Sequence, residues 1–70
     1  MLLIINGQKQ ELQQFDAETT LSEIVSSLGL KEDRVAIEHN GSIAARLGWA
    51  TARVVPGDKL EIVHFVGGGC

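Results

Sequence analysis

The sequence predicts an α+β fold in which one helix packs across a mixed sheet of four to five strands. Three observations predict it: a length of 70 residues that allows only one small core, short apolar runs separated by turn sequences, and a single stretch with helical apolar spacing. Because such a helix has one apolar side, it buries that side most simply against one face of a sheet.

The first predicted element is a hairpin. The apolar run Leu2–Ile5 ends at an Asn-Gly pair, which favours a type I′ turn because both central residues of that turn need a positive φ. A polar strand at about 8–13 then pairs back along the first. Leu3 and Ile5 are expected to face the core, and the other two residues of the run replace them if the register slips by one.

The next element is a helix with signals at both ends. Thr20 and Glu23 fit a capping box, in which each side chain bonds the other's backbone amide. Gly29 fits the left-handed position just after a helix. Between these signals, four apolar residues follow helical spacing and form one stripe: Leu21, Ile24, Val25 and Leu28.

The second half of the chain is predicted to be mostly strands and turns. A charged link at 31–34 precedes a strand at 35–39, which a second Asn-Gly pair ends. The stretch 42–53 has no clear pattern, and its alanines indicate either a turn of helix or a short strand. Pro56-Gly57-Asp58 is a turn, since proline presets φ, and it leads into a last strand at 59–65.

This order of elements is that of a β-grasp fold, with the first and last strands as neighbours. Side chains alternate along a strand, so Leu60 and Ile62 are expected to face the helix while Glu61, Val63 and Phe65 point away from it. The expected core comprises ten residues: Leu3, Ile5, Leu21, Ile24, Val25, Leu28, Val35, Ile37, Leu60 and Ile62.

The exposed pair Val63 and Phe65 is the candidate docking surface, because apolar side chains on an outer face often mark an interaction site. The alternative is that loops cover them. Trp49 is interpreted as part of the core or a lid over its edge, with the docking face as an alternative. His39 is expected to be a surface residue beside a turn, and Asp58 part of a solvated acidic surface.

Composition excludes several function classes. The net charge is −3 and the six basic residues are dispersed, so no basic stripe for nucleic acid is present. No apolar run approaches the length that spans a membrane. One cysteine cannot form an internal disulfide, which suits a cytoplasmic protein. Two histidines and that cysteine lie far apart in sequence and predict no metal site. No preorganised acid, base or nucleophile is evident, so the chain is not predicted to be an enzyme.

The end of the sequence, Val66-Gly67-Gly68-Gly69-Cys70, adds nothing to a core. We therefore divide the chain into a β-grasp domain at 1–65 and a flexible glycine-rich tail at 66–70. A glycine run is either a frayed end or a tool that threads a narrow channel where a Cβ would clash. Val66 to Gly69 can span roughly 13 Å when extended, at about 3.3 Å per residue.

The whole chain resembles the ThiS family of sulfur carriers in thiamine thiazole biosynthesis. The matching segments, in order, are Ile4-Ile5-Asn6-Gly7, the stretch 35–41, Arg46-Leu47-Gly48-Trp49-Ala50, the stretch 56–63 and the ending 64–69. Each segment alone is weak evidence, because Asn-Gly turns are common. Their order and spacing and the terminal glycines make the resemblance specific.

The resemblance implies a ubiquitin-like β-grasp fold and a protein cosubstrate that partner enzymes modify. A ThiF-like enzyme, which binds the ATP itself, would adenylate the carboxylate of Gly69. A cysteine desulfurase or sulfur-relay protein would then supply sulfur, and the thiazole synthase ThiG would take it from the resulting thiocarboxylate. Val63, Phe65, Val66, Gly67 and Gly68 would contact these partners. The carrier itself would need no cofactor, nucleic acid or membrane.

Cys70 departs from the family pattern, which ends on glycine. Three interpretations remain open: Cys70 is removed before use, it is an added residue, or the chain works with an intact thiol. Two other functions also remain open. One is a carrier like MoaD, which serves molybdopterin or another pathway, and the other is a ubiquitin-like interaction module with an inert tail.

Overall fold

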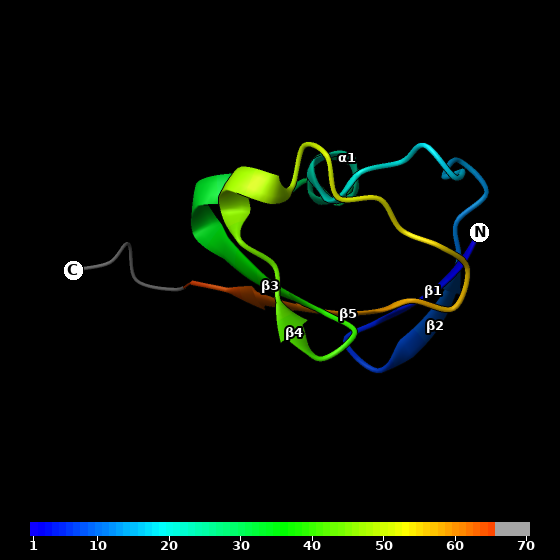
Figure 1. Cartoon of the computed structure of the whole chain (residues 1–70). Coiled ribbons are helices and arrows are strands. Elements are labelled where there is room, and N and C mark those ends of the chain that lie inside the picture. The colour runs from blue at the N-terminus through cyan, green and yellow to red at the C-terminus, as the bar shows by residue number, and fades with distance from the viewer. Residues whose placement is uncertain (66–70) are drawn as a thin grey trace.

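The computed structural model describes residues 1–65. Its strands are β1 (Leu2–Ile5), β2 (Gln8–Glu11), β3 (Val35–His39), β4 (Ser42–Ile43) and β5 (Lys59–His64), with one α-helix, α1 (Leu21–Ser27), and two 3-10 helices, η1 (Glu32–Arg34) and η2 (Arg46–Gly48). The strands form one sheet in the order β2-β1-β5-β3-β4, and α1 lies across one face of it (Figure 1). β1 and β5 are parallel, and the other pairs are antiparallel. The predicted mixed sheet and β-grasp fold are confirmed.

Both Asn-Gly hairpin turns form as predicted. Asn6 and Gly7 have φ values of 51° and 80°, and Asn40 and Gly41 have 52° and 86°, which are the positive values that a type I′ turn needs. β2 is shorter than predicted, because Glu11 already pairs with the first residue of β1.

The helix has the predicted caps but a shorter apolar stripe. The Glu23 amide donates to Thr20 Oγ1 at 3.3 Å, and the Thr20 amide donates to Glu23 Oε1 at 3.0 Å, which completes the capping box. At the other end Gly29 has a φ of 76°, and the Leu30 amide donates to the carbonyl of Val25. The prediction that Leu28 belongs to the core is wrong: it is 37% exposed, because this short helix ends one residue earlier and Leu28 lies at its cap.

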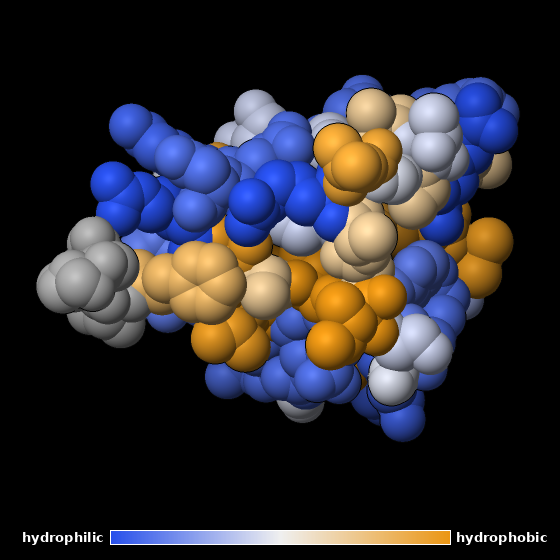
Figure 2. Space-filling model, turned by 60° about the vertical axis from the view of Figure 1, so that its left-hand side comes forward, coloured by the Kyte–Doolittle hydropathy of each residue, from blue (hydrophilic) through white to orange (hydrophobic). Residues whose placement is uncertain are grey.

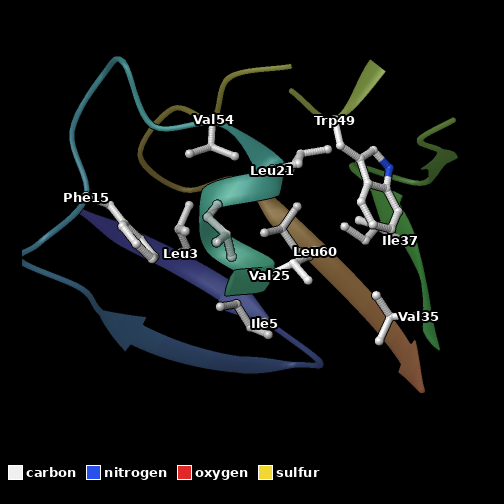
Figure 3. Close-up of a cluster of buried hydrophobic side chains, with 11 residues drawn as sticks. Leu3, Ile5, Phe15, Leu21, Val25, Val35, Ile37, Trp49, Val54 and Leu60 are labelled. Atoms are coloured by element: carbon white, nitrogen blue, oxygen red, sulfur yellow. The ribbon is translucent and has the colours of Figure 1, made fainter. Parts of the chain in front are cut away.

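The core fills the space between α1 and the sheet. Eight of the ten predicted residues are buried, together with three that come from the connecting segments, namely Phe15, Trp49 and Val54 (Figure 3). The loops therefore supply part of the core that strand and helix patterns alone did not predict. Ile62 is a second correction, since it is only partly buried and packs against the edge of the cluster, two residues beyond Leu60 on β5.

The stretch 42–53, which had no clear pattern, packs around one tryptophan. Trp49 is 1% exposed, which confirms it as a core residue, and its Nε1 donates to the carbonyl of Ala44 at 2.8 Å. The Arg46 guanidinium lies 5.7 Å from the centre of the indole ring and donates to the carbonyl of Val35. Within residues 1–65, no helix has the length and apolar character needed to cross a membrane.

Candidate functional site

The candidate site is the face of the sheet opposite α1, at the end of β5. Alternation along β5 buries Leu60 against the helix and turns Glu61 and Val63 to the outer face. Val63 is 58% exposed, and Phe65, just after the strand, is 48% exposed. The expected exposure of this pair is therefore observed, while its role in docking stays a prediction.

A shallow groove runs beside Val63 on the same face. Its lining comes from three neighbouring strands and comprises Ala36, Ile37, Glu38, Ile43, Glu61 and Val63. Ile43 is 82% exposed, so most of its side chain already faces solvent. Figure 2 shows hydrophobic side chains gathered on one face of the molecule, with polar residues around them. An exposed apolar surface of this kind commonly marks a contact site.

The end of β5 is held by hydrogen bonds from outside its antiparallel ladder. The side chain of Asn6 both accepts from the Ile62 amide at 2.7 Å and donates to the Ile62 carbonyl at 3.3 Å. The Phe65 amide donates to the carbonyl of Arg34 at 2.8 Å. The register of the strand is thus fixed up to Phe65, which gives the candidate docking pair a defined position. The sequence marked Asn6 only as a turn residue, and nothing local indicated this second role.

The other end of β5 is anchored by Asp58, contrary to the expectation of a solvated surface. Asp58 is 7% exposed, and its carboxylate contacts His39 Nε2 at 2.8 Å, Asn40 Nδ2 at 3.1 Å and the Val55 amide at 3.0 Å. His39 is likewise not a free surface residue, because it is only 23% exposed and paired. Both expectations were wrong because His39 and Asn40 precede Asp58 by 19 and 18 residues, so no local pattern shows that these side chains meet.

These contacts decide the acidity of Asp58. Burial alone would raise its pKa, but the hydrogen bonds from His39, the Val55 amide and Asn40 outweigh burial, so the pKa lies below its ordinary value of 3.8. A carboxyl with a lower pKa in the folded state stabilises the fold above its unfolded pKa. That contribution is lost as the pH falls through the folded pKa.

We therefore expect Asp58→Asn to lower the free energy of unfolding by about 1–3 kcal/mol at neutral pH, because an amide nitrogen would face hydrogen-bond donors. Below about pH 4 the wild type should lose stability more steeply than the variant. Urea unfolding from neutral pH to about pH 3 measures both effects. Asp33→Asn, an exposed aspartate on η1, is the matched control. Parallel pH curves for wild type and Asp58→Asn would contradict the assignment.

The remaining candidate residues, Val66, Gly67, Gly68 and Gly69, lie outside the described residues, as does Cys70. His64 ends β5 and is exposed. Residues 1–65 contain no group of three or more histidine, cysteine, aspartate or glutamate side chains that could hold a metal ion.

Comparison with known proteins places the chain among sulfur carriers. The sequence profile of the ThiS family matches residues 3–69. The crystal structure of the thiamine biosynthesis protein ThiS from Geobacter metallireducens is 28% identical, with a TM-score of 0.81, and the alignment covers 99% of this chain and 100% of that one. The NMR structure of a thiamine biosynthesis protein from the same organism is 30% identical, with a TM-score of 0.79, covering 100% and 90% of the two chains.

Two curated relatives are longer proteins. The thiazole synthases of Paramagnetospirillum magneticum and Magnetococcus marinus are 41% and 32% identical to this chain over 69 residues, which is 99% of its length. The chain spans only 20% of the length of each thiazole synthase that it matches. Since the family profile covers nearly the whole sequence and the solved relatives share its fold, the chain belongs to the ThiS family, the family of sulfur carrier proteins in thiamine biosynthesis.

Proposed function

We propose that this chain carries sulfur as a thiocarboxylate on Gly69 and donates it for thiazole formation. The observation that carries the proposal is the family match, which runs through the glycine segment and ends at Gly69, the proposed acceptor. The resemblance of the chain to part of two thiazole synthases supports a thiazole synthase as the enzyme that takes the sulfur.

The chemistry needs an activated carboxylate, because the oxide of a free carboxylate is a poor leaving group. A ThiF-like enzyme transfers AMP from ATP to the Gly69 carboxylate and releases pyrophosphate. The terminal sulfur of a persulfide, supplied by a cysteine desulfurase or a relay protein, then bonds to the carbonyl carbon and AMP leaves. A second thiol cleaves the sulfur–sulfur bond, which releases the thiocarboxylate and a disulfide.

The carrier and the adenylating enzyme have different roles in the proposed reaction. Residues 1–65 contain no group of three or more histidine, cysteine, aspartate or glutamate side chains that could hold the metal ion that accompanies ATP. We propose that the adenylating partner binds the ATP and that the carrier takes no cofactor of its own. Its contribution is the exposed surface around Val63 and Phe65, which docks while the glycine segment enters the partner's active site.

Mass spectrometry tests the proposal. The form ending at Gly69 is incubated with the ThiF-like enzyme of the same organism, ATP, a cysteine desulfurase and cysteine. The expected result is a mass gain equal to the replacement of one oxygen by sulfur, and no gain without ATP. Binding to the enzyme without any mass gain would favour the interaction module and overturn the carrier mechanism. A thiocarboxylate that a molybdopterin-forming enzyme, but not a thiazole synthase, can consume would assign the carrier to the other pathway.

We expect Phe65→Ala to weaken binding to the adenylating enzyme by about 1–3 kcal/mol, the usual effect of removing an aromatic anchor at an interface. The melting temperature should change little, because this side chain is 48% exposed in the free protein. Titration calorimetry and thermal denaturation measure the two quantities.

The chain offers a matched pair of controls for the docking face. Val63 and Val55 are each 58% exposed, but Val55 lies in the turn before β5 rather than on the outer face at its far end. Val63→Ala should weaken binding and Val55→Ala should not. A large loss of stability in Phe65→Ala with unchanged affinity per folded molecule would show that the face is assigned wrongly.

A further inference from the structure

We propose that the groove beside Val63 receives an arginine of the adenylating partner, whose guanidinium binds between the carboxylates of Glu38 and Glu61. This inference rests on the proposed function, since it specifies what the docking surface recognises. It is carried by the register of the sheet, by the charges in the groove and by the apolar lining around them.

The register places two negative side chains directly opposite each other. Glu38 on β3 pairs with Glu61 on β5, and both line the groove on the outer face. Side chains directly opposite on antiparallel strands have Cβ atoms about 4.5–5.5 Å apart, and like charges there destabilise the sheet. The free protein thus carries two like charges opposite each other in the lining of its exposed groove.

No cation of the described chain relieves this repulsion. The three ion pairs in residues 1–65 involve Glu11, Asp58 and Glu18, and none involves Glu38 or Glu61. Lys59 precedes Glu61 by two residues on β5, yet it forms no ion pair with either groove carboxylate. The two carboxylates therefore remain open to a positive group from outside.

The rest of the lining fits the stem of an arginine. Ile43 is the neighbour of Glu38 on β4, and Val63 is the neighbour of Ala36 across β3 and β5. Apolar side chains thus border the acidic pair in two directions, with Ile43 across the sheet from Glu38 and Val63 two residues along β5 from Glu61. Arginine buries its methylene stem along apolar surface while its guanidinium binds carboxylates through several N–H groups. An arginine that projects from an apolar surface complements both features of this groove.

Two variants separate recognition from stability. Glu38→Gln and Glu61→Gln each remove one charge and keep the side-chain size. Each should weaken binding to the adenylating enzyme about 10-fold at about 50 mM salt, since the guanidinium would then bond a neutral amide oxygen in place of a carboxylate. The same variants should raise the melting temperature of the free carrier by about 1–5 °C, because the cross-strand repulsion is relieved. If the two glutamates had only a structural role, their substitution would not weaken binding while it raises the melting temperature.

Glu32→Gln is the matched control, because Glu32 is an exposed acid on η1 that does not line the groove. Its binding should stay within about twofold of wild type. If Glu32→Gln weakens binding as much as Glu38→Gln, general charge steering acts and the inference is overturned. Unchanged affinity in Glu38→Gln, with weakened affinity in Val63→Ala, would show that the groove recognises only apolar groups and would also overturn it.

Substitution of exposed arginines of the enzyme, one at a time, identifies the bound residue. The correct arginine should show a non-additive effect on affinity with Glu38→Gln, whereas coupling to a lysine alone would contradict the proposal. The proposed function is tested separately, by the thiocarboxylate mass gain of the wild type. If the wild type fails to gain this mass while Glu38→Gln still binds more weakly than Glu32→Gln, the function is overturned and the groove is not.

Discussion

Truncation of Leu60 to alanine is expected to lower the free energy of unfolding by about 2–5 kcal/mol, the range for a large side chain removed from a packed core. Leu60 is completely buried beneath α1, on the strand that pairs with both β1 and β3 (Figure 3). Domains of this size have a stability of about 5–15 kcal/mol. The loss should therefore lower the melting temperature by at least about 8 °C.

The same strand provides the control. Ile62 has the same parity as Leu60 and packs against the edge of the core, but it is only partly buried. Ile62→Ala should cost about 1–2 kcal/mol, because part of its side chain already faces water. Urea unfolding of both variants measures the difference. Equal costs for the two truncations would show that the core extends farther along β5 than the structure indicates.

Local signals explain why much of the fold could be predicted from the sequence. The Asn-Gly pairs and the capping box around Thr20 act within a few residues, so they specify two hairpin turns and the start of α1 wherever they occur. The alternation along β5 then follows from strand geometry, and it correctly placed Leu60 inside and Val63 outside.

The parts that could not be predicted depend on contacts that are distant in sequence. Phe15 and Val54 are buried although each lies in a connecting segment with no periodic pattern. Asp58, which directly precedes β5, looked like a surface residue because its partners His39 and Asn40 come from the distant hairpin of β3 and β4. Spacing rules describe one element at a time, so they do not reveal which loop will cover the core or which polar groups will meet.

The same reasoning applies to the candidate site. The exposed Val63 follows from alternation on a single strand, but the groove beside it does not. Its acidic pair appears only once β3 and β5 are aligned so that Glu38 lies opposite Glu61. A shift of β3 by one residue against β5 would turn Glu38 toward the helix and leave Glu61 on the outer face. The proposed recognition by the outer face therefore depends on the same strand pairing that builds the core.

The form ending at Gly69 is expected to be adenylated, whereas the form ending at Cys70 should react at least about 100-fold more slowly. The reacting carboxylate must lie beside the α-phosphate of ATP, and a misplacement of about 1 Å can cost about a hundredfold in rate. One additional extended residue moves the carboxylate by about 3.3–3.6 Å. It also adds a side chain at a point where the family pattern has none.

A substitution within the glycine segment tests the same requirement without changing its length. Gly68→Val, made in the form ending at Gly69, should fold normally and dock normally, because Gly68 follows the docking pair in sequence. Its adenylation should be strongly reduced, since a branched side chain would clash where the partner admits only backbone. Unchanged thermal denaturation and unchanged affinity for the enzyme are the controls that exclude misfolding.

ATP–pyrophosphate exchange with the adenylating enzyme measures all three proteins. Exchange requires only formation and reversal of the acyl adenylate, so it reports on the first chemical step and is independent of the sulfur donor. Equal exchange by the forms ending at Gly69 and at Cys70 would show that Gly69 is not the required acceptor, and the mechanism would then have to move to Cys70. Slow exchange by Gly68→Val alongside normal binding would place the defect in the position of the carboxylate, which is the property that the glycine segment is proposed to provide.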